Sequence, residues 1–332
     1  MAQLAKTIAA RATSEEKAAK YEEWYKQASG HAARYGSVMK AEKPKHTMDD
    51  IKGLDEVKAL VSSFMFMAEH PEALKHYGID GGLGLLLYGP PGTGKTMFAE
   101  AIANKLNLPL FVVTPADIFK SYVGESEKAV KQIFQELEAC PEGAILFVDE
   151  CESIFSKRSS DTKDYKAAVT TELLQRINGF GVDGSKRILV GATNRPDIID
   201  SAYLRYKRFS HLVHVTPPDD EAIRSIIYAK LPDHIELVGI TKDDVVAMAT
   251  RTETRIIDGE TINYKSGYYS AADICGIIEE ACRYGLEEME KKQTSKYEPL
   301  TREMFEKAFA KNPPSISNKV YEEYMNFRKG KD

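Results

Sequence analysis

The residues from 89 to 96 have the types and spacing that bind a phosphate chain. They spell Gly-Pro-Pro-Gly-Thr-Gly-Lys-Thr, which fits the phosphate-loop pattern of a glycine, four residues, a glycine, a lysine and a hydroxyl residue. Glycines allow backbone N–H groups to approach phosphate oxygens closely. We therefore predict that Lys95 contacts the β- and γ-phosphates of a nucleotide and that the Thr96 hydroxyl ligates Mg²⁺. The alternative is a glycine turn that is followed by lysine and threonine by chance.

A pair of acids farther along the chain could supply hydrolytic chemistry. Asp149 and Glu150 follow the apolar run 145–148, so a buried strand would hold both carboxylates at the edge of a sheet. Asp149 can hold a metal ion, directly or through water, and Glu150 can polarise an attacking water molecule. Two adjacent carboxylates also need a cation nearby, because otherwise one of them tends to take up a proton. The alternative is an exposed strand end with two solvated acids.

The elements around these residues predict how they are positioned. The loop lies between the apolar run 84–88 and a pattern with apolar residues at helical spacing. Near-continuous apolar strands that alternate with helical patterns predict an α/β fold with a parallel sheet covered on both faces. Active groups of such sheets gather at the carboxyl ends of the strands, where the loop, Asp149 and Asn194 fall. The predicted strands are 84–88, 109–113, 144–149, 188–193 and 211–215.

The chain after Pro217 and Pro218 is predicted to be mainly helical. Asp258 and Gly259 lie between β-forming residues and predict a hairpin at 252–266. Helical spacing predicts the helices 126–139, 219–231, 242–251, 270–291, 301–310 and 318–329.

These patterns divide the chain into four predicted parts. A capping-box signature predicts a helix within residues 1–35, and the lysine-rich stretch 36–47 predicts a linker. The predicted domains are an N-terminal helical segment and linker at 1–45, a large α/β domain at 46–216, a small helical domain at 217–312 and a C-terminal helix at 313–332.

Composition restricts the class of protein. The 332 residues carry 45 Lys and Arg against 50 Asp and Glu, so the balance of charge disfavours nucleic acid as a bulk partner. The four cysteines show neither metal spacing nor a disulfide framework and predict reduced thiols in the cytoplasm. The sequence contains no apolar run long enough for a transmembrane segment. Residues 1–14 lack acids, which suggests either a transit peptide or an ordinary amphipathic helix.

Four motifs in order carry a family resemblance. They are the phosphate loop, the acids at 149–150, Gly-Ala-Thr-Asn-Arg-Pro at 191–196 and Arg-x-x-Arg-Phe at 205–209. Together they resemble the AAA ATPase module over residues 46–310. The resemblance implies a large α/β domain with strand order 5-1-4-3-2, a smaller helical domain, ATP and Mg²⁺ as cofactors, and a homo-oligomeric ring that is usually a hexamer.

The resemblance also implies roles for individual residues. Asn194 would sense the γ-phosphate, and Arg205 and Arg208 would be arginine fingers that reach into the site of the next subunit. The alternative for both arginines is surface ion pairing. The implied nucleotide-binding residues are Asp50, Gly53, Pro91, Gly92, Thr93, Gly94, Lys95, Thr96, Met97 and Ala271.

Residues 120–128 resemble the central pore loop of the family. Tyr122, Val123 and Gly124 would then grip an extended polypeptide without reading its sequence, because a ring and methyl groups contact any backbone. The alternative is a Tyr-Val pair packed into the core just before a helix.

The wording Tyr-Val-Gly-Glu-Ser-Glu-Lys and the C-terminal Pro-Pro-Ser-Ile-Ser followed by a tyrosine-rich helix are similar to one subgroup. This subgroup contains the ATPase that dismantles ESCRT-III filaments and the severing enzymes katanin, spastin and fidgetin. Residues 8–28 resemble the first part of the MIT helices, which suggests an adaptor contact through the N-terminal helix. The chain departs from the subgroup at 252–266 and at Ala167, Ala168, Lys207 and Ala271.

The sequence therefore predicts an ATPase that remodels, threads or disassembles a polypeptide or filament substrate. The motifs leave three alternatives open. These are a nucleic-acid-acting AAA loader or helicase, a nucleotide-dependent scaffold or switch that hydrolyses little, and a motor that extracts membrane proteins.

Overall fold

A computed structural model describes Ala19 and residues 40–42, 44–78, 83–119, 124–140, 143–156, 164–179, 186–205, 208–257, 260–264 and 267–329. Contacts divide the chain into two compact units. The first, here called the sheet unit, contains Met1–Met48, Ala59–Tyr88 and Thr96–Val213. The second, here called the helical unit, contains Asp49–Lys58, Gly89–Lys95 and His214–Asp332. The domain boundaries given above remain predictions, and the helix expected at 1–35 lies outside the described residues except for Ala19.

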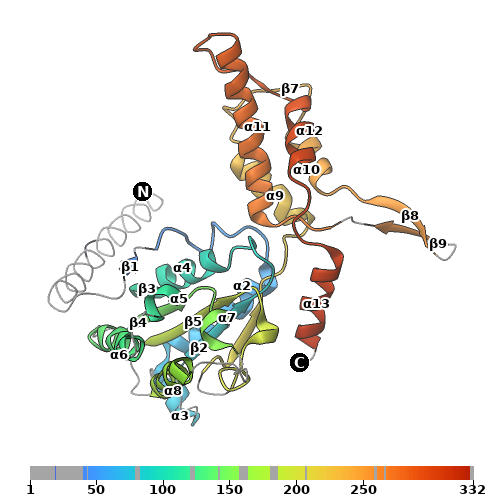
Figure 1. The fold of residues 1–332 in the computed structure, drawn as a ribbon. Coiled ribbons are helices and arrows are strands. Elements are labelled where there is room, and N and C mark those ends of the chain that lie inside the picture. The colour runs from blue at the N-terminus through green and yellow to red at the C-terminus, as the bar shows by residue number, and fades with distance from the viewer. Residues whose placement is uncertain are drawn as a thin grey trace, which may run out of the picture. The chain divides into compact units, whose positions relative to one another are not determined.

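A six-stranded sheet forms the centre of the sheet unit (Figure 1). Its order is β1-β3-β4-β5-β2-β6, and the pairs β3·β4, β4·β5 and β2·β5 are parallel. The five predicted strands follow the predicted order 5-1-4-3-2, read from the β6 edge. The strands are β1 (Lys40–Glu42), β2 (Leu83–Tyr88), β3 (Leu110–Val113), β4 (Ala144–Val148), β5 (Arg187–Thr193) and β6 (His211–His214).

Strand β1, the one strand of this sheet that was not predicted, corrects the prediction of a linker at 36–47. β1 pairs antiparallel with β3, so that Lys40 lies opposite Val112 and Glu42 opposite Leu110. A three-residue strand at the edge of a sheet is too short to show alternating hydrophobicity, and its two ends are charged. The partner strand, rather than a pattern in its own sequence, makes this segment extended.

Both faces of the sheet are covered. Consecutive residues of a strand point to opposite faces, so burial of neighbouring residues in β2 shows that each face is covered. Leu86 packs in a core that it shares with α6 and α8, while its neighbours Leu85 and Leu87 are also fully buried. Helix α6 confirms the helix predicted at 126–139. The helices that belong mainly to this unit are α2 (Asp55–Glu69), α3 (Pro71–His76), α4 (Lys95–Leu106), α5 (Pro115–Ile118), α6 (Glu125–Glu138), α7 (Glu152–Phe155), α8 (Asp164–Gly179) and the 3₁₀ turn η1 (Pro196–Ile198).

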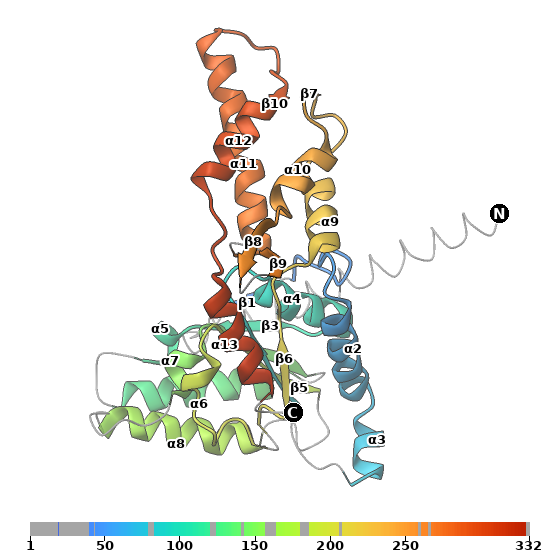
Figure 2. The same cartoon turned by 90° about the vertical axis from the view of Figure 1, so that its right-hand side faces the viewer.

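Side-chain caps start three of the helices of the helical unit. Asp219, Thr241 and Ser270 each accept a hydrogen bond from a backbone N–H three residues later. Four helices pack side by side around one apolar core (Figure 2), and the fifth, α13, follows them. The helices are α9 (Asp220–Lys230), α10 (Lys242–Ala249), α11 (Ala271–Lys291), α12 (Arg302–Lys311) and α13 (Asn318–Lys329), and all five confirm the predicted helices.

Strands also occur in this unit. The predicted hairpin is confirmed by β8 (Glu253–Ile257) and β9 (Glu260–Tyr264), which pair antiparallel and extend away from the helices (Figure 1). Its turn residues Asp258 and Gly259 lie outside the described residues. Two further strands in this mainly helical part were not predicted, namely β7 (Leu237–Val238) and β10 (Leu300–Thr301), which form a short parallel pair. Two-residue strands carry no periodicity that a sequence could reveal.

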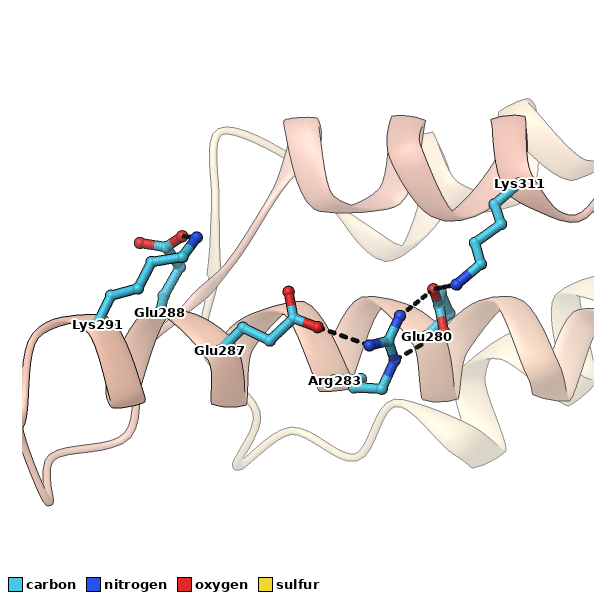
Figure 3. Close-up of polar contacts among 6 residues, drawn as sticks. All are labelled: Glu280, Arg283, Glu287, Glu288, Lys291 and Lys311. Atoms are coloured by element: carbon cyan, nitrogen blue, oxygen red, sulfur yellow. Dashed lines mark hydrogen bonds and ion pairs between the residues drawn. The ribbon is translucent and has the colours of Figure 1, made fainter.

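A network of charged side chains joins α11 to α12 (Figure 3). Glu280 accepts hydrogen bonds from Arg283 Nε at 3.0 Å and from Lys311 Nζ at 2.6 Å. Arg283 also donates to Glu287 at 2.6 Å. The hydrogen bonds from Arg283 and then from Lys311 lower the pKa of Glu280 from 4.5 to about 2, because they favour the ionised carboxylate.

Replacing Glu280 with glutamine is expected to make the free energy of unfolding less dependent on pH in the acid range. The pKa of Glu280 is lower in the folded protein, so its ionised form stabilises the fold above pH 4.5, and this stabilisation is lost as the pH falls toward 2. Thermal unfolding should show a lower Tm for Glu280→Gln at neutral pH and a difference that shrinks as the pH falls below 4.5. A Tm difference that stays constant over this range would contradict the role of the carboxylate.

Candidate nucleotide-binding site

The phosphate loop joins the end of β2 to the start of α4, as its pattern requires. Lys95 is buried, and its Nζ donates hydrogen bonds to the carbonyl oxygens of Gly89 at 2.9 Å and Pro90 at 2.7 Å. The Thr93 hydroxyl donates to the same Pro90 carbonyl at 3.0 Å. The loop therefore curls around the ammonium group of its own lysine, which fixes a positive charge at the start of α4.

Gly92 needs to be glycine for two independent reasons. Its φ of +74° lies in the left-handed region, where side chains cause strain. An added Cβ would also lie 2.7 Å from the Ser270 hydroxyl and 3.0 Å from the Cβ of Ala272. The Gly92 carbonyl accepts a hydrogen bond from the Ala272 N–H at 3.1 Å. The first turn of α11, which contains the predicted contact residue Ala271, therefore packs on this part of the loop.

Thr96 and Asp149 come together as the sequence predicts. Asp149 follows β4, and its N–H donates to the Val113 carbonyl at 3.2 Å, so the end of the sheet fixes its backbone. The Thr96 hydroxyl donates to Asp149 Oδ2 at 3.5 Å. A hydroxyl and a carboxylate side by side are the hard oxygen ligands that Mg²⁺ prefers, with phosphate oxygens and water completing its coordination. These two side chains fit a magnesium ion.

Glu150 has a backbone conformation that its sequence does not reveal. Its φ is +46°, a region that costs a residue with a side chain on the order of 1–2 kcal/mol. The Glu150 N–H donates to Asp149 Oδ1 at 2.9 Å, and the Cys151 N–H donates to the Ala192 carbonyl at 3.0 Å. These bonds hold the turn, and the Glu150 side chain is exposed. Strain at such a position is typical of functional sites.

The thiol of Cys151, which follows Asp149 and Glu150 in the chain, is not placed to act as a nucleophile. Cys151 is fully buried, and burial raises the pKa of its thiol well above the ordinary value. The thiol therefore stays protonated and packs in the core.

Asn194 lies at the same edge of the sheet. It follows β5, whose Thr193 pairs with Tyr88 at the end of β2 and whose Gly191 pairs with Val148 at the end of β4. The Thr193 hydroxyl accepts a hydrogen bond from the Arg195 N–H at 2.9 Å, which shapes the turn around Asn194. The strand register therefore brings Asn194 to the edge where β2 leads into the loop and β4 ends at Asp149.

The segment that contains the implied nucleotide-binding residues Asp50 and Gly53 lies close to α9. Gly53 has a φ of +63°, and an added Cβ would overlap the Cβ of Ala222 in the first turn of α9. Ile51 is buried, whereas Asp50 is exposed. Segment 49–58, the loop 89–95 and the first turns of α9 and α11 all belong to the helical unit. Of the other predicted contacts, Pro91 is exposed, and Gly94, Met97 and Ala271 are partly buried.

Replacing Gly53 with alanine is expected to destabilise the fold. The left-handed backbone costs about 1–2 kcal/mol, and the overlap with Ala222 adds about 1–3 kcal/mol. Gly78→Ala is the matched control, because Gly78 has a φ of +70° and nothing lies within 4 Å of an added Cβ. Chemical denaturation should show the larger loss of stability for Gly53→Ala. Equal losses in the two variants would contradict the contact with Ala222.

The two candidate fingers differ in their surroundings. Arg208 donates from Nε to Asn178 Oδ1 at 2.8 Å and from its guanidinium to the Ala202 carbonyl. Both partners are in its own chain. Arg205 ends the turn 201–205 and is exposed. The structure thus holds Arg208 in place and leaves Arg205 at the surface of the sheet unit.

The candidate pore loop is described only at its end. Tyr122 and Val123 lie outside the described residues. Lys207, which lies between the two candidate arginine fingers, is also outside them. Gly124 has a φ of +82° and precedes α6 as its N-cap, so it makes the turn expected of a glycine there.

Several residues next to the loop were not predicted from the sequence. Ser270 and Asp273 form a reciprocal cap at the start of α11, and the Ser-x-x-Asp spacing resembles a capping box that could have revealed it. His214 follows from no motif. Its ring lies 3.5 Å from the position of a Cβ added at Gly89.

This fold and site define a class of protein. A parallel sheet with a phosphate loop after one strand, acids after a second and an asparagine after a third is the arrangement of a P-loop nucleoside-triphosphate-binding domain. Residues 85–217 match the family model described as "ATPase family associated with various cellular activities (AAA)". Over this segment the chain is similar to the AAA ATPase family.

Curated proteins from archaea resemble the chain. It is 34% identical over 244 residues to Protein SAV of Sulfolobus acidocaldarius, covering 73% of this chain and 29% of that protein. It is 34% identical over 259 residues to Proteasome-activating nucleotidase 2 of Haloferax volcanii, covering 76% and 58%. It is 32% identical over 297 residues to a Cell division cycle protein 48 homolog of Archaeoglobus fulgidus, covering 86% and 38%. The chain thus spans less than two thirds of each of these relatives.

Two further findings concern the rest of the molecule. The four cysteines are free thiols. In the part of the chain that the structure describes, no helix has the length and apolar composition needed to cross a membrane.

Proposed function

We propose that the chain is a magnesium-dependent ATPase. The observation that carries the proposal is the pairing of Thr96 with Asp149 at the end of β4, next to the strained and exposed Glu150. The match of residues 85–217 to the AAA family supports ATP as the nucleotide. When bound, Mg²⁺ would neutralise charge on the β- and γ-phosphates and stabilise ADP as the leaving group.

The residues of the site divide this task among themselves. Lys95 and the backbone N–H groups of the loop hold the β- and γ-phosphates, and Thr96 and Asp149 hold the metal. Glu150 orients the attacking water and accepts its proton. Asn194 donates a hydrogen bond toward the γ-phosphate. Arg205 and Arg208 complete the site of a neighbouring copy, which requires a head-to-tail ring.

We further propose that hydrolysis drives remodelling or threading of a polypeptide through this ring, most simply a hexamer. The names of relatives, which include proteasome-activating nucleotidases and a Cell division cycle protein 48 homolog, favour a protein substrate. Tyr122, Val123 and Gly124 would grip the polypeptide, and the N-terminal helix would contact an adaptor. The free thiols favour the cytoplasm as the place of action.

The kind of protein substrate is a separate question. Filament disassembly or microtubule severing rests on the sequence similarities at 120–128 and 313–317, and the relatives reported above carry other names. We therefore keep the substrate class as a polypeptide or a protein filament. A nucleic-acid loader and a slow nucleotide switch are the alternatives.

Phosphate release by the full chain tests the proposal. The chain should hydrolyse ATP with Mg²⁺, stop when EDTA is added, and be stimulated by an unfolded polypeptide such as casein rather than by single-stranded DNA. Stimulation by DNA alone would favour the loader. Tight ATP binding without measurable release would favour the switch.

A further inference from the structure

The C-terminal segment 313–329 is linked to the phosphate loop by two sets of contacts. All residues involved belong to the helical unit, which contains both the loop and this segment. One set of contacts begins at Gly92 and the other at Gly89. One set reaches Ser315, which precedes α13, and the other reaches Tyr324 within α13.

The first set of contacts links Gly92 to Ser315 by hydrogen bonds of the first turn of α11 and of its cap. The Gly92 carbonyl accepts a hydrogen bond from the Ala272 N–H at 3.1 Å. The Ser270 hydroxyl accepts from the Asp273 N–H at 3.1 Å, and Asp273 Oδ2 accepts from the Ser270 N–H at 2.7 Å. The same Oδ2 accepts from the hydroxyl of Ser315 at 2.6 Å. One carboxylate oxygen thus holds both the turn that touches Gly92 and the start of the C-terminal segment.

The second set passes through two stacked rings. A Cβ added at Gly89 would overlap the carbonyl of Val215 and lie 3.5 Å from the ring of His214. The His214 ring stacks on Tyr324 of α13, with centroids 5.8 Å apart and an interplanar angle of 26°. His214 is 6% exposed and Tyr324 is 7% exposed. His214, which α13 covers, therefore lies close to the first glycine of the loop.

The segment between these places is fixed to the same unit. Tyr268 and Ile316 exchange backbone hydrogen bonds at 2.8 and 3.2 Å, and Ile316 is buried. Tyr321 stacks on Tyr268 with centroids 4.3 Å apart. Because Tyr268 lies just before Ser270, this attachment also keeps the cap of α11 in place.

We propose that the C-terminal segment positions the phosphate loop, so that its docking and nucleotide binding are coupled. Tyr324 acts through His214, and Ser315 acts through Asp273. Both are positioning residues, because neither contacts the loop itself. Tyr324 covers His214, which lies close to Gly89. Ser315 bonds to the carboxylate that caps α11, and the first turn of α11 bonds to Gly92. The proposal rests on the proposed function, in which the loop holds the nucleotide. Coupling is reciprocal, so docking of α13 raises nucleotide affinity and nucleotide raises the stability of docked α13.

Calorimetric titration of the full chain with Mg-ADP tests one direction of the coupling. Tyr324→Leu keeps an apolar side chain but removes the ring that stacks on His214, and we expect ADP affinity to fall by about fivefold or more. Tyr324→Phe keeps the ring and should retain the affinity of the unmodified chain. Tyr297→Leu is the matched control, because Tyr297 is 85% exposed, and its affinity should not change. Unchanged affinity in Tyr324→Leu would overturn the proposal.

Hydrogen exchange of the unmodified chain tests the other direction and needs no variant to fold. The amides of 318–329 should exchange more slowly when ADP is bound. Lys95→Ala should abolish both ADP binding and this protection. If ADP binds through Lys95 and exchange in 318–329 does not respond, this proposal fails while the proposed function stands. If the unmodified chain binds no nucleotide, both fail together.

Discussion

Glu150→Gln is expected to reduce ATP turnover by about 10²–10⁴-fold, the usual contribution of a general base, while ATP still binds. Glutamine has the size of glutamate and keeps the backbone N–H that donates to Asp149 Oδ1, so the metal-binding carboxylate stays in place. It cannot accept a proton from water. Phosphate release under steady-state conditions, together with an ATP-binding titration, measures both effects.

The control for this prediction is Glu138, which ends helix α6 and does not follow strand β4. Glu138 is exposed at the end of α6, and Glu138→Gln should hydrolyse ATP at the unmodified rate. A Glu150→Gln chain with unaltered turnover would remove Glu150 from its role. Loss of ATP binding in the same variant would instead show that the side chain holds the nucleotide.

Arg205→Ala is expected to lower ATP turnover by on the order of 10³-fold or more, the usual range for an arginine finger. Arg205 is exposed at the surface of the sheet unit, so its removal should leave the fold and nucleotide affinity intact. The control Arg251→Ala removes another exposed arginine and should change neither property. Unaltered turnover in Arg205→Ala would show that this arginine is an ordinary surface residue.

Arg208 should behave differently because its own chain holds it. Replacement by alanine removes the donor to Asn178 Oδ1 and to the Ala202 carbonyl, and each lost bond costs about 0.5–1.5 kcal/mol of stability or more where the partner stays buried. Arg208→Ala should therefore lower both turnover and the midpoint of chemical denaturation. A loss of turnover without a loss of stability would mean that these two bonds contribute little to the fold.

The parts of the fold that the sequence predicted are those with long, periodic patterns. α13 was predicted at 318–329 and begins and ends there, because its apolar residues recur over several turns. β1 was missed because only pairing with β3 makes Lys40–Glu42 extended. β7 and β10 were missed because two residues have no period.

The candidate site shows the same division. The closeness of Thr96 and Asp149 followed from two motifs and the rule that parallel strands end at one edge. The left-handed backbone of Glu150 did not follow, because glutamate is not a residue that favours it. Gly89 lies close to His214, and Gly92 lies close to Ser270, although these segments are far apart in the sequence. Only the folded chain shows this closeness.

The central claim is that one copy of the chain completes the hydrolytic site of the next. It is tested most directly by mixing two inactive variants, Glu150→Gln and the double variant Arg205→Ala with Arg208→Ala. In a head-to-tail ring, the double variant keeps Glu150 and receives arginines from a Glu150→Gln neighbour, so an equal random mixture should regain about one quarter of the active sites. Phosphate release that rises on mixing, and falls again on dilution, is the predicted result. A mixture that remains as inactive as its two components, beside an unmodified chain whose rate per molecule is the same at every dilution, would contradict the claim.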